Sequence, residues 1–266
     1  MKRILLLIGT VAFSVLFVLC TAKIYRMYAD KRKSAESFES LAELIADDPS
    51  EEIVLDAQTE VSDTEHITEP KKISPYEKYA PVYEQNSDLV GWITIDGTSI
   101  NYPVMQTKDE PDFYLNHGFD KSYSDYGVPY VQEDCDILTS DNLVIYGHNM
   151  KNGTMFSDLE KYANEWFFSE YRYIRFDTLS ELGTYEIIAV FRTVAYSSEG
   201  FKYYNFVNAD DTSDFNNYIE KCKQLSLYDT GVTAEYGDKL LTLSTCEYTR
   251  TNGRFVVVAK LVKGYG

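Results

Sequence analysis

The segment TLSTCEYTRTNGRFVVVAKLV, residues 242–262, decides how this chain folds and where its chemistry lies. The run Lys239–Thr245 is typical of a buried strand, and the run Arg254–Val262 of a second strand, because both are rich in β-branched and aliphatic residues. Cys246 directly follows the first run, and Arg254 opens the second. The sequence therefore predicts a thiol and a guanidinium at two strand ends.

A histidine follows a third apolar run. Leu143–Tyr146 is strand-like, and Gly147 and His148 come directly after it. Cysteine attacks as its thiolate, and a thiol with a pKa of about 8.5 is only a few per cent ionised at neutral pH. A nearby imidazole can take the thiol proton and later protonate a leaving amine, and an arginine can stabilise a developing oxyanion. Cys246, His148 and Arg254 are thus candidates for nucleophile, acid/base and charge stabiliser.

Each residue taken alone also has a structural interpretation. A cysteine in a strand is usually a core residue, and an arginine at a strand start is usually a surface charge. We expect Cys135 and Cys222 to be buried as small hydrophobic residues, and His66 and His117 to lie in the stalk and in a loop. Paired spacings such as CxxC or HxxxH do not occur, so the sequence predicts neither a metal site nor a cofactor.

The remaining pattern predicts a mainly β fold with a few helices. Asp96-Gly97 indicates a hairpin between two of the strands. The further predicted strands are Val90–Ile95, Ser99–Val104, Val128–Val131, Tyr171–Phe176 and Tyr185–Ala195, and the predicted helices cover residues 76–83, 156–166 and 211–225. About eight short strands with few helices favour a closed or nearly closed β-barrel.

The N-terminus has the composition of a membrane anchor. Residues 4–22 carry no charge, and at about 1.5 Å per residue they span roughly 30 Å, the thickness of a hydrocarbon core. Large residues at 17–19 argue against a cleaved signal peptide. Lys2 and Arg3 favour a cytoplasmic N-terminus, whereas the cations from Lys23 to Lys33 favour the reverse. We expect residues 1–22 to be an anchor with its N-terminus inside and the body outside.

Residues 23–72 are predicted to form an acidic stalk or linker that is partly helical, because Phe38, Leu41, Leu44 and Ile45 have helical spacing. Residues 73–266 are predicted to form the folded domain. The formal net charge of the chain is −17, which argues against nucleic acid as a partner because phosphates repel such a surface.

Three segments together resemble the sortases, in the order of that family. They are the early strands GWITIDGTSINYPVMQ with FYLNHGFD (91–120), the histidine segment YGHNMKNGTMF (146–156) and the cysteine–arginine segment (242–262). The resemblance covers about residues 75–263. The predicted helices before the barrel and the helix at 211–225 favour class B. The resemblance implies a sortase-type closed eight-stranded β-barrel with N-terminal helices and a helix before the penultimate strand.

The resemblance also implies a function. Such enzymes are membrane-anchored cysteine transpeptidases on the outer face of Gram-positive cells. They cut a C-terminal sorting motif after Thr, hold the surface protein as a thioacyl-enzyme, and pass it to an amine of a peptidoglycan precursor. Cys246, His148 and Arg254 match the nucleophile, the acid/base and the stabilising arginine. Asn116, Tyr146, Ser244, Thr245 and Glu247 are expected to bind substrate by similarity, and the segment 196–206 lies where class B members contact the sorting motif.

Two other functions remain open on the sequence alone. The first is a pilin-polymerising sortase, in which a lysine of another protein resolves the intermediate. The second is a surface-tethered binding domain that keeps the fold without catalysis, for which Cys246 would be unreactive.

Overall fold

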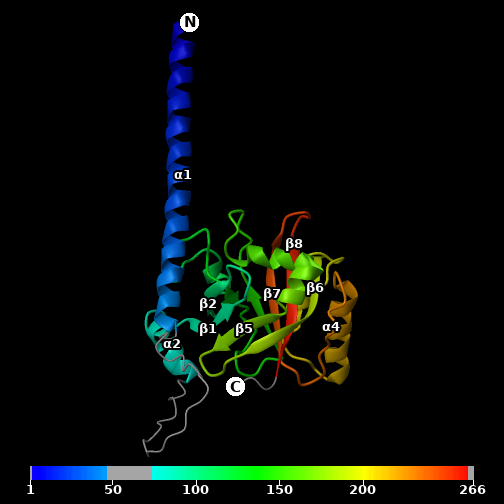
Figure 1. Cartoon of the computed structure of the whole chain (residues 1–266). Helices are drawn as coiled ribbons and strands as arrows, with labels where there is room; N and C mark the ends of the chain where they lie inside the picture. Colours follow the sequence, from blue (N-terminus) through cyan, green and yellow to red (C-terminus); the bar gives the residue numbers. More distant parts are fainter. Residues whose placement is uncertain (1, 47–73, 263–266) are drawn as a thin grey trace, which may run out of the picture.

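The segment that ends at Cys246 forms strand β7 (Leu240–Glu247), and the next segment forms β8 (Gly253–Leu261). In this computed structural model, which describes residues 2–46 and 74–262, the two strands pair antiparallel along their length (Figure 1). Every residue of β7 except Cys246 is buried. Leucines alternate with Thr and Ser over residues 241–244, and all four residues are buried, so the strand is covered on both faces.

Eight strands close into a barrel in the order β1-β2-β3-β4-β7-β8-β6-β5, and β5 pairs with β1. The six strands before β7 are β1 (Leu89–Thr94), β2 (Asn101–Met105), β3 (Tyr130–Val131), β4 (Asn142–Tyr146), β5 (Tyr173–Thr178) and β6 (Thr184–Val194). Pairing is antiparallel except between β2 and β3 and between β4 and β7. The predicted closed eight-stranded barrel is confirmed, and each predicted strand is present with shifted ends.

The predicted hairpin joins β1 and β2. Gly97 has a φ of +74°, a left-handed conformation that glycine adopts without steric cost. The Ile95 amide donates to the Ile100 carbonyl at 3.0 Å and closes the turn. The hairpin predicted from Asp96-Gly97 is therefore present, with glycine at the position that needs a left-handed backbone.

Two predicted helices are α2 (Pro75–Tyr83) and α4 (Thr212–Leu225), which precedes the penultimate strand. Ser74 and Glu77 form a reciprocal capping box at the start of α2. Asp211 caps α4 by accepting from the Asp214 amide. The buried face of α4 carries four residues that recur at helical spacing: Phe215, Tyr218, Ile219 and Cys222.

The helix expected over residues 156–166 is divided in two. Residues Phe156–Ala163 form the 3₁₀ helix η3, and Glu165–Glu170 form α3. Asn164 separates them in an extended conformation, and its side chain accepts from the Trp166 amide to cap α3. Two short 3₁₀ helices, η2 (Phe113–Leu115) and η4 (Tyr203–Asn205), lie in the connections.

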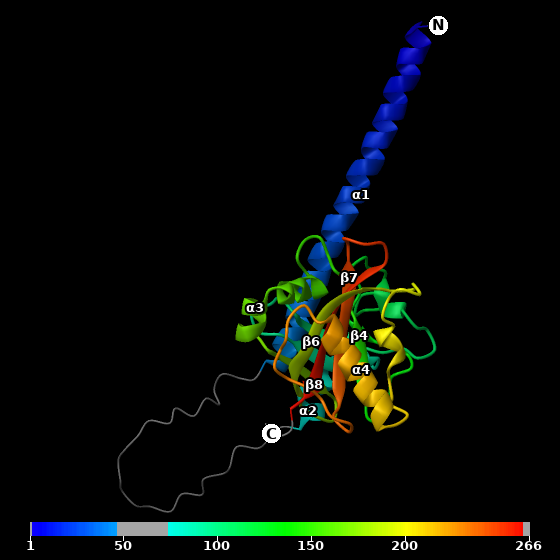
Figure 2. The same ribbon diagram turned by 90° about the vertical axis from the view of Figure 1, so that its right-hand side faces the viewer.

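Helix α1 (Lys2–Ile45) is continuous through the predicted anchor and the first part of the predicted stalk. Its C-terminal part lies beside the barrel, where Phe38 and Leu41 are buried, and its N-terminal part extends far beyond it (Figures 1 and 2). Among the described residues, α1 is the one helix long and apolar enough to cross a membrane, and an 18-residue window within it has a mean hydropathy of 2.1. The rest of the predicted stalk, with His66, and the ends of the predicted domain at 73 and 263–266 lie outside the described residues.

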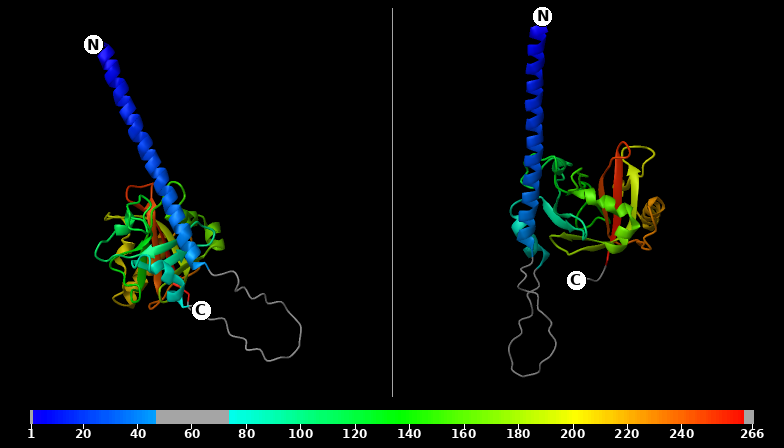
Figure 3. Two further views of the ribbon diagram at one scale, coloured as in Figure 1. Left: turned by 90° about the vertical axis from the view of Figure 1, so that its left-hand side faces the viewer. Right: turned by 45° about the horizontal axis from the view of Figure 1, so that its top comes forward.

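The two ends of the barrel face in different directions relative to α1. The turn between β7 and β8 lies at the end toward which α1 extends, and β8 finishes at the opposite end (Figures 1 and 3). Cys246 and Arg254 flank that turn. The predicted site therefore lies at the end of the barrel beyond which the N-terminal part of α1 extends.

Candidate active site

The register of β7 and β8 places Cys246 directly opposite Arg254. Opposed residues of an antiparallel pair share one face of the sheet, with Cβ atoms about 4.5–5.5 Å apart. Both side chains are partly exposed. Arg254 Nη1 donates to the Gly253 carbonyl at 3.0 Å, and its guanidinium lies 5.9 Å from the centre of the Tyr196 ring. The thiol and a permanent positive charge are therefore neighbours.

His148 reaches this point from β4, which runs parallel to β7. The pairing sets Tyr146 opposite Ser244. Beyond the strand, the Gly147 amide donates to the Ser244 carbonyl at 3.1 Å, and Thr245 Oγ1 donates to the Gly147 carbonyl at 2.7 Å. The segment that carries the imidazole is thus tied to the strand that carries the thiol.

A backbone carbonyl orients the imidazole. His148 Nε2 lies 2.7 Å from the carbonyl oxygen of Leu115, at the end of η2. A carbonyl oxygen accepts hydrogen bonds only, so Nε2 carries the hydrogen and the neutral ring keeps Nδ1 as its proton acceptor. Nδ1 is therefore the nitrogen at which this imidazole can accept a proton.

Asn149 joins the two segments and was not predicted. Its Nδ2 donates to the Cys246 carbonyl at 2.8 Å and to Glu160 Oε1 at 2.9 Å. The hydroxyl of Tyr248 donates to the Asn149 carbonyl at 2.7 Å. The sequence offered one indication of this role: Asn149 directly follows His148 in the segment YGHNMKNGTMF.

Cys246, His148 and Arg254 line one cavity of about 380 Å³. This volume falls within the range of ordinary small-ligand sites. Three predicted substrate-binding residues also line it: Tyr146, Ser244 and Thr245. Four further tyrosines contribute to the wall: Tyr130, Tyr196, Tyr203 and Tyr204. The structure therefore brings six of the eight predicted site residues into one cavity.

Asn116 and Glu247 are not among the residues that line this cavity. Asn116 is exposed, and its carbonyl accepts from the Ser124 amide at 3.0 Å. Glu247 is 3% exposed, and its carboxylate accepts from the Thr249 amide at 2.8 Å. Asn116 follows Leu115 and Glu247 follows Cys246, so both lie next to the site in sequence. Their roles in substrate binding stay predictions.

The tyrosines supply neutral hydroxyls. Burial raises the pKa of Tyr203 to about 12, although its hydrogen bond with Ser244 and the charge of Arg254 each lower it. Burial also raises the pKa of Tyr146 and of Tyr130, and the hydrogen bond from Tyr130 to Asp112 adds to the second shift. These hydroxyls therefore stay protonated at neutral pH.

Tyr196 was not identified individually within the segment 196–206. It is 79% exposed, its φ of +58° is left-handed, and its ring lines the cavity. A left-handed backbone is uncommon for a bulky residue and occurs often at functional sites. Backbone conformation of this kind has no signature in a single sequence.

The two other cysteines of the barrel are structural. Cys135 and Cys222 are fully buried, as predicted, and both thiols are free. Burial raises the pKa of Cys135 to about 11 and that of Cys222 to about 12. Neither thiol is therefore suited to nucleophilic attack at neutral pH.

Comparison with known proteins agrees with this geometry. The family model of the sortase domain matches residues 93–262. Sortase B of Listeria monocytogenes serovar 1/2a is 36% identical over 180 residues, which are 66% of this chain and 71% of that protein. Sortase B of Staphylococcus aureus is 34% identical over 181 residues, which are 67% of this chain and 72% of that protein.

Solved structures give the same result. Sortase B from Bacillus anthracis in complex with AAEK1 matches with a TM-score of 0.70 at 30% identity, covering 90% of this chain and all of that chain. The Staphylococcus aureus sortase B–substrate complex matches with a TM-score of 0.65 at 29% identity, covering 73% of this chain and 88% of that chain.

The barrel, and the cavity where a cysteine meets a histidine and an arginine, define a cysteine transpeptidase, and the chain belongs to the sortase family. Its relatives and structural neighbours are sortase B proteins, so it is a class B sortase. These findings favour an enzyme over the non-catalytic binding domain that the sequence left open.

The exposure of the thiols predicts their order of reaction. Cys20 is free and exposed, so it is replaced by serine for this test. With iodoacetamide at neutral pH, the folded Cys20→Ser chain should be alkylated first at Cys246, while Cys135 and Cys222 react only after denaturation. Peptide mass mapping after timed quenching measures the order. The Cys246→Ala variant is the control and should lack the early product. Alkylation of Cys135 or Cys222 in the folded protein as fast as that of Cys246 would contradict this assignment.

Proposed function

We propose that this sortase cleaves a C-terminal sorting motif after a Thr residue, holds the surface protein on Cys246 as a thioacyl-enzyme, and transfers it to an amine of a peptidoglycan precursor. One observation carries the proposal: Cys246 and Arg254 face each other across β7 and β8, and His148 lines the same cavity. These groups supply the nucleophile, the oxyanion partner and the proton carrier that acyl transfer requires.

The first half-reaction forms the thioester. Nδ1 of His148 accepts the proton of the Cys246 thiol, and the sulfur attacks the carbonyl carbon of the Thr residue. Arg254 faces the oxyanion that develops there, and its fork of donors can bind that charge. His148 then gives its proton to the nitrogen of the leaving peptide, and the C–N bond breaks. The acyl group stays on Cys246 Sγ.

The second half-reaction runs the same steps in reverse with a different amine. The acceptor amine attacks the thioester carbonyl, and His148 Nδ1 takes its proton. The C–S bond breaks, and the proton returns to the sulfur of Cys246. Proton balance is kept, because one imidazole serves as base and then as acid in each half.

The tyrosine-lined wall is proposed to hold the sorting motif. Tyr146, Ser244 and Thr245 lie on the two strands that lead to His148 and Cys246. The residues flanking the cavity, Asn116 and Glu247, are proposed to act at its edge. Tyr196 is proposed to cover the bound peptide, since its exposed ring stands over Arg254.

We propose that residues 1–22 anchor the enzyme in the membrane, with the N-terminus in the cytoplasm, and that residues 23–72 form a stalk before the catalytic domain at 73–266. The continuous helix α1 supports this arrangement, because it leaves the barrel on the side of the β7–β8 turn (Figure 1). The cavity would then lie outside the cell and near the membrane, where surface proteins that carry sorting signals and peptidoglycan precursors meet.

The thioacyl intermediate can be observed directly. Incubation of the purified chain with a panel of sorting-motif peptides should add the mass of the peptide fragment that ends in Thr. Intact-mass spectrometry measures the adduct, and hydroxylamine should release it. Cys246→Ala should form none while keeping its thermal unfolding temperature, and Cys135→Ala is the control that should form it normally. An adduct on Cys246→Ala would rule out this residue as the nucleophile.

Arg254 has a separate test. If its guanidinium binds the oxyanion, Arg254→Ala should lower the rate of thioester formation by about 10²–10³-fold. Arg250→Ala is the matched control, because Arg250 is an exposed arginine of the same turn and is not among the residues that line the cavity. Stopped-flow or quenched-flow measurement with the best peptide gives the rate. Near-normal thioester formation by Arg254→Ala would remove the proposed role.

A further inference from the structure

The juxtamembrane part of α1 is attached to the barrel at discrete points. Near the membrane end, Lys33 Nζ lies 2.7 Å from Asp120 Oδ2 and donates to Ser122 Oγ at 2.7 Å. One turn earlier, Asp30 Oδ2 accepts from the Asp125 amide at 2.8 Å. All three partners of the helix belong to a single loop, residues 116–126. The helix therefore holds this loop through both an ion pair and its backbone.

The loop that α1 holds continues directly from the group that orients the catalytic histidine. Leu115, whose carbonyl accepts from His148 Nε2, immediately precedes Asn116. Within the loop, the Ser124 amide donates to the Asn116 carbonyl at 3.0 Å, and the Gly118 amide donates to the Ser122 carbonyl at 2.8 Å. These short hydrogen bonds make the loop a closed unit, so its attachment to α1 also places the Leu115 carbonyl.

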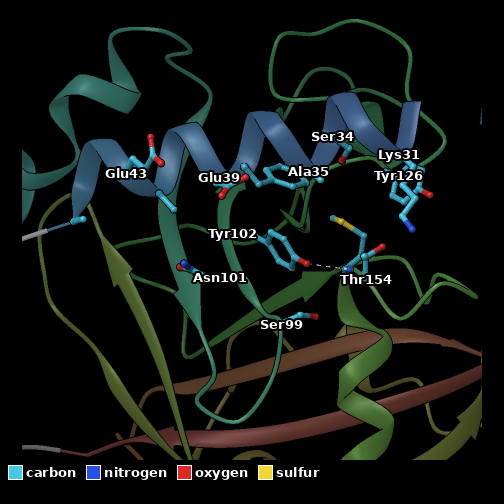
Figure 4. Close-up of a pocket in the computed structure, with 14 residues that line it drawn as sticks. Lys31, Ser34, Ala35, Glu39, Glu43, Ser99, Asn101, Tyr102, Tyr126 and Thr154 are labelled. Carbon is cyan, nitrogen blue, oxygen red and sulfur yellow. Dashed lines mark hydrogen bonds between the residues drawn. The ribbon is translucent and has the colours of Figure 1, made fainter. Parts of the chain in front are cut away.

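A second set of contacts leads from α1 to the other side of the histidine. Phe38 packs edge to face on Tyr102, with ring centres 5.0 Å apart. The Tyr102 hydroxyl accepts from the Met155 amide at 3.2 Å, drawn as the dashed line in Figure 4. The next amide, Phe156, donates to the His148 carbonyl at 2.8 Å. Both backbone segments that hold His148 are thus connected to one helix.

Along part of their contact, the helix and the barrel are separated by a space that Phe38 and Tyr102 also line. A cavity of about 590 Å³ lies there, lined on the helix side by Glu39 and Glu43 and on the barrel side by Tyr102 and Tyr126 (Figure 4). Because the two surfaces are not packed together throughout, the position of α1 depends on the contacts that flank the cavity. Tyr126 also accepts from Asn152 Nδ2 at 2.9 Å, which links the 116–126 loop to the loop after His148.

We infer that the juxtamembrane helix is a positioning element for catalysis: Lys33 and Phe38 hold the two segments that fix the orientation of His148. Neither residue is among those that line the catalytic cavity, so both act through others. The anchor would then also be a structural part of the active site. The inference rests on the proposed role of His148 as acid/base.

The test compares neighbouring cations of α1 in the full-length chain in detergent micelles. Lys33→Met removes the ammonium that holds Asp120 and Ser122 and keeps a side chain that favours helix. Arg32→Met is the matched control, because Arg32 pairs with Glu36 on the same helix and its side chain is 82% exposed. Lys33→Arg keeps the ion pair and should restore normal behaviour. The Lys33 side chain is 57% exposed, so all three variants should fold.

Two readouts are needed. The first is the imidazole ¹H–¹⁵N correlation spectrum of histidine-labelled protein, which reports the tautomer of each ring. The chain has three histidines, so His148→Gln assigns the signal. The second is kcat and KM for the peptide that forms the thioacyl adduct. Lys33→Met should lose the single Nε2–H form of His148, lower kcat about 10-fold or more, and leave KM within about twofold, because misplaced catalytic groups cost turnover more than binding.

A Lys33→Met spectrum of His148 identical to that of Arg32→Met would overturn the inference, and so would unchanged kcat. Failure of the proposed function gives a different result. In that case His148→Gln keeps normal turnover, whatever the spectrum of Lys33→Met shows.

Discussion

The active site depends on the position of β7 between two strands of opposite direction. Its antiparallel partner β8 sets Arg254 opposite Cys246, and its parallel partner β4 brings His148 to the same end. Both registers are fixed, because β7 is buried on both faces and a slip of one residue would exchange the side chains that pack on each face. The barrel therefore supplies the alignment of thiol, imidazole and guanidinium as a consequence of core packing.

The strands supply alignment, and hydrogen bonds from the loops supply orientation. The imidazole is fixed by a neutral carbonyl, that of Leu115, and by a segment that Asn149 joins to Cys246. Groups held in this way need little reorganisation during reaction, which is a large part of what an enzyme site contributes. The same loops contact α1 through Asp120 and Asp125. Helix α1 and the candidate active site are thus parts of one connected structure.

The sequence predicted what local pattern determines. Apolar β-branched runs predicted the strands, and Cys246, His148 and Arg254 were singled out as candidates because they stand at the ends of three such runs. The sequence did not predict the 3₁₀ helix at Phe156–Ala163. It also did not predict the hydrogen bond between His148 and the Leu115 carbonyl, or the packing of α1 on the barrel. Leu115 and His148 are 33 residues apart, and Lys33 and Ser122 are 89 residues apart. Contacts of this kind arise from tertiary packing, which leaves no periodicity in the chain.

The most direct test of the account is a crystal structure of the enzyme trapped with a sorting peptide whose cleavable Thr–X bond is replaced by a thiol-reactive group. The account predicts a covalent bond to Cys246 Sγ, the trapped carbonyl oxygen within about 3 Å of the Arg254 guanidinium, and His148 Nδ1 directed at the sulfur. A carbonyl oxygen that points away from Arg254, or an imidazole whose Nδ1 is turned from the sulfur, would contradict it.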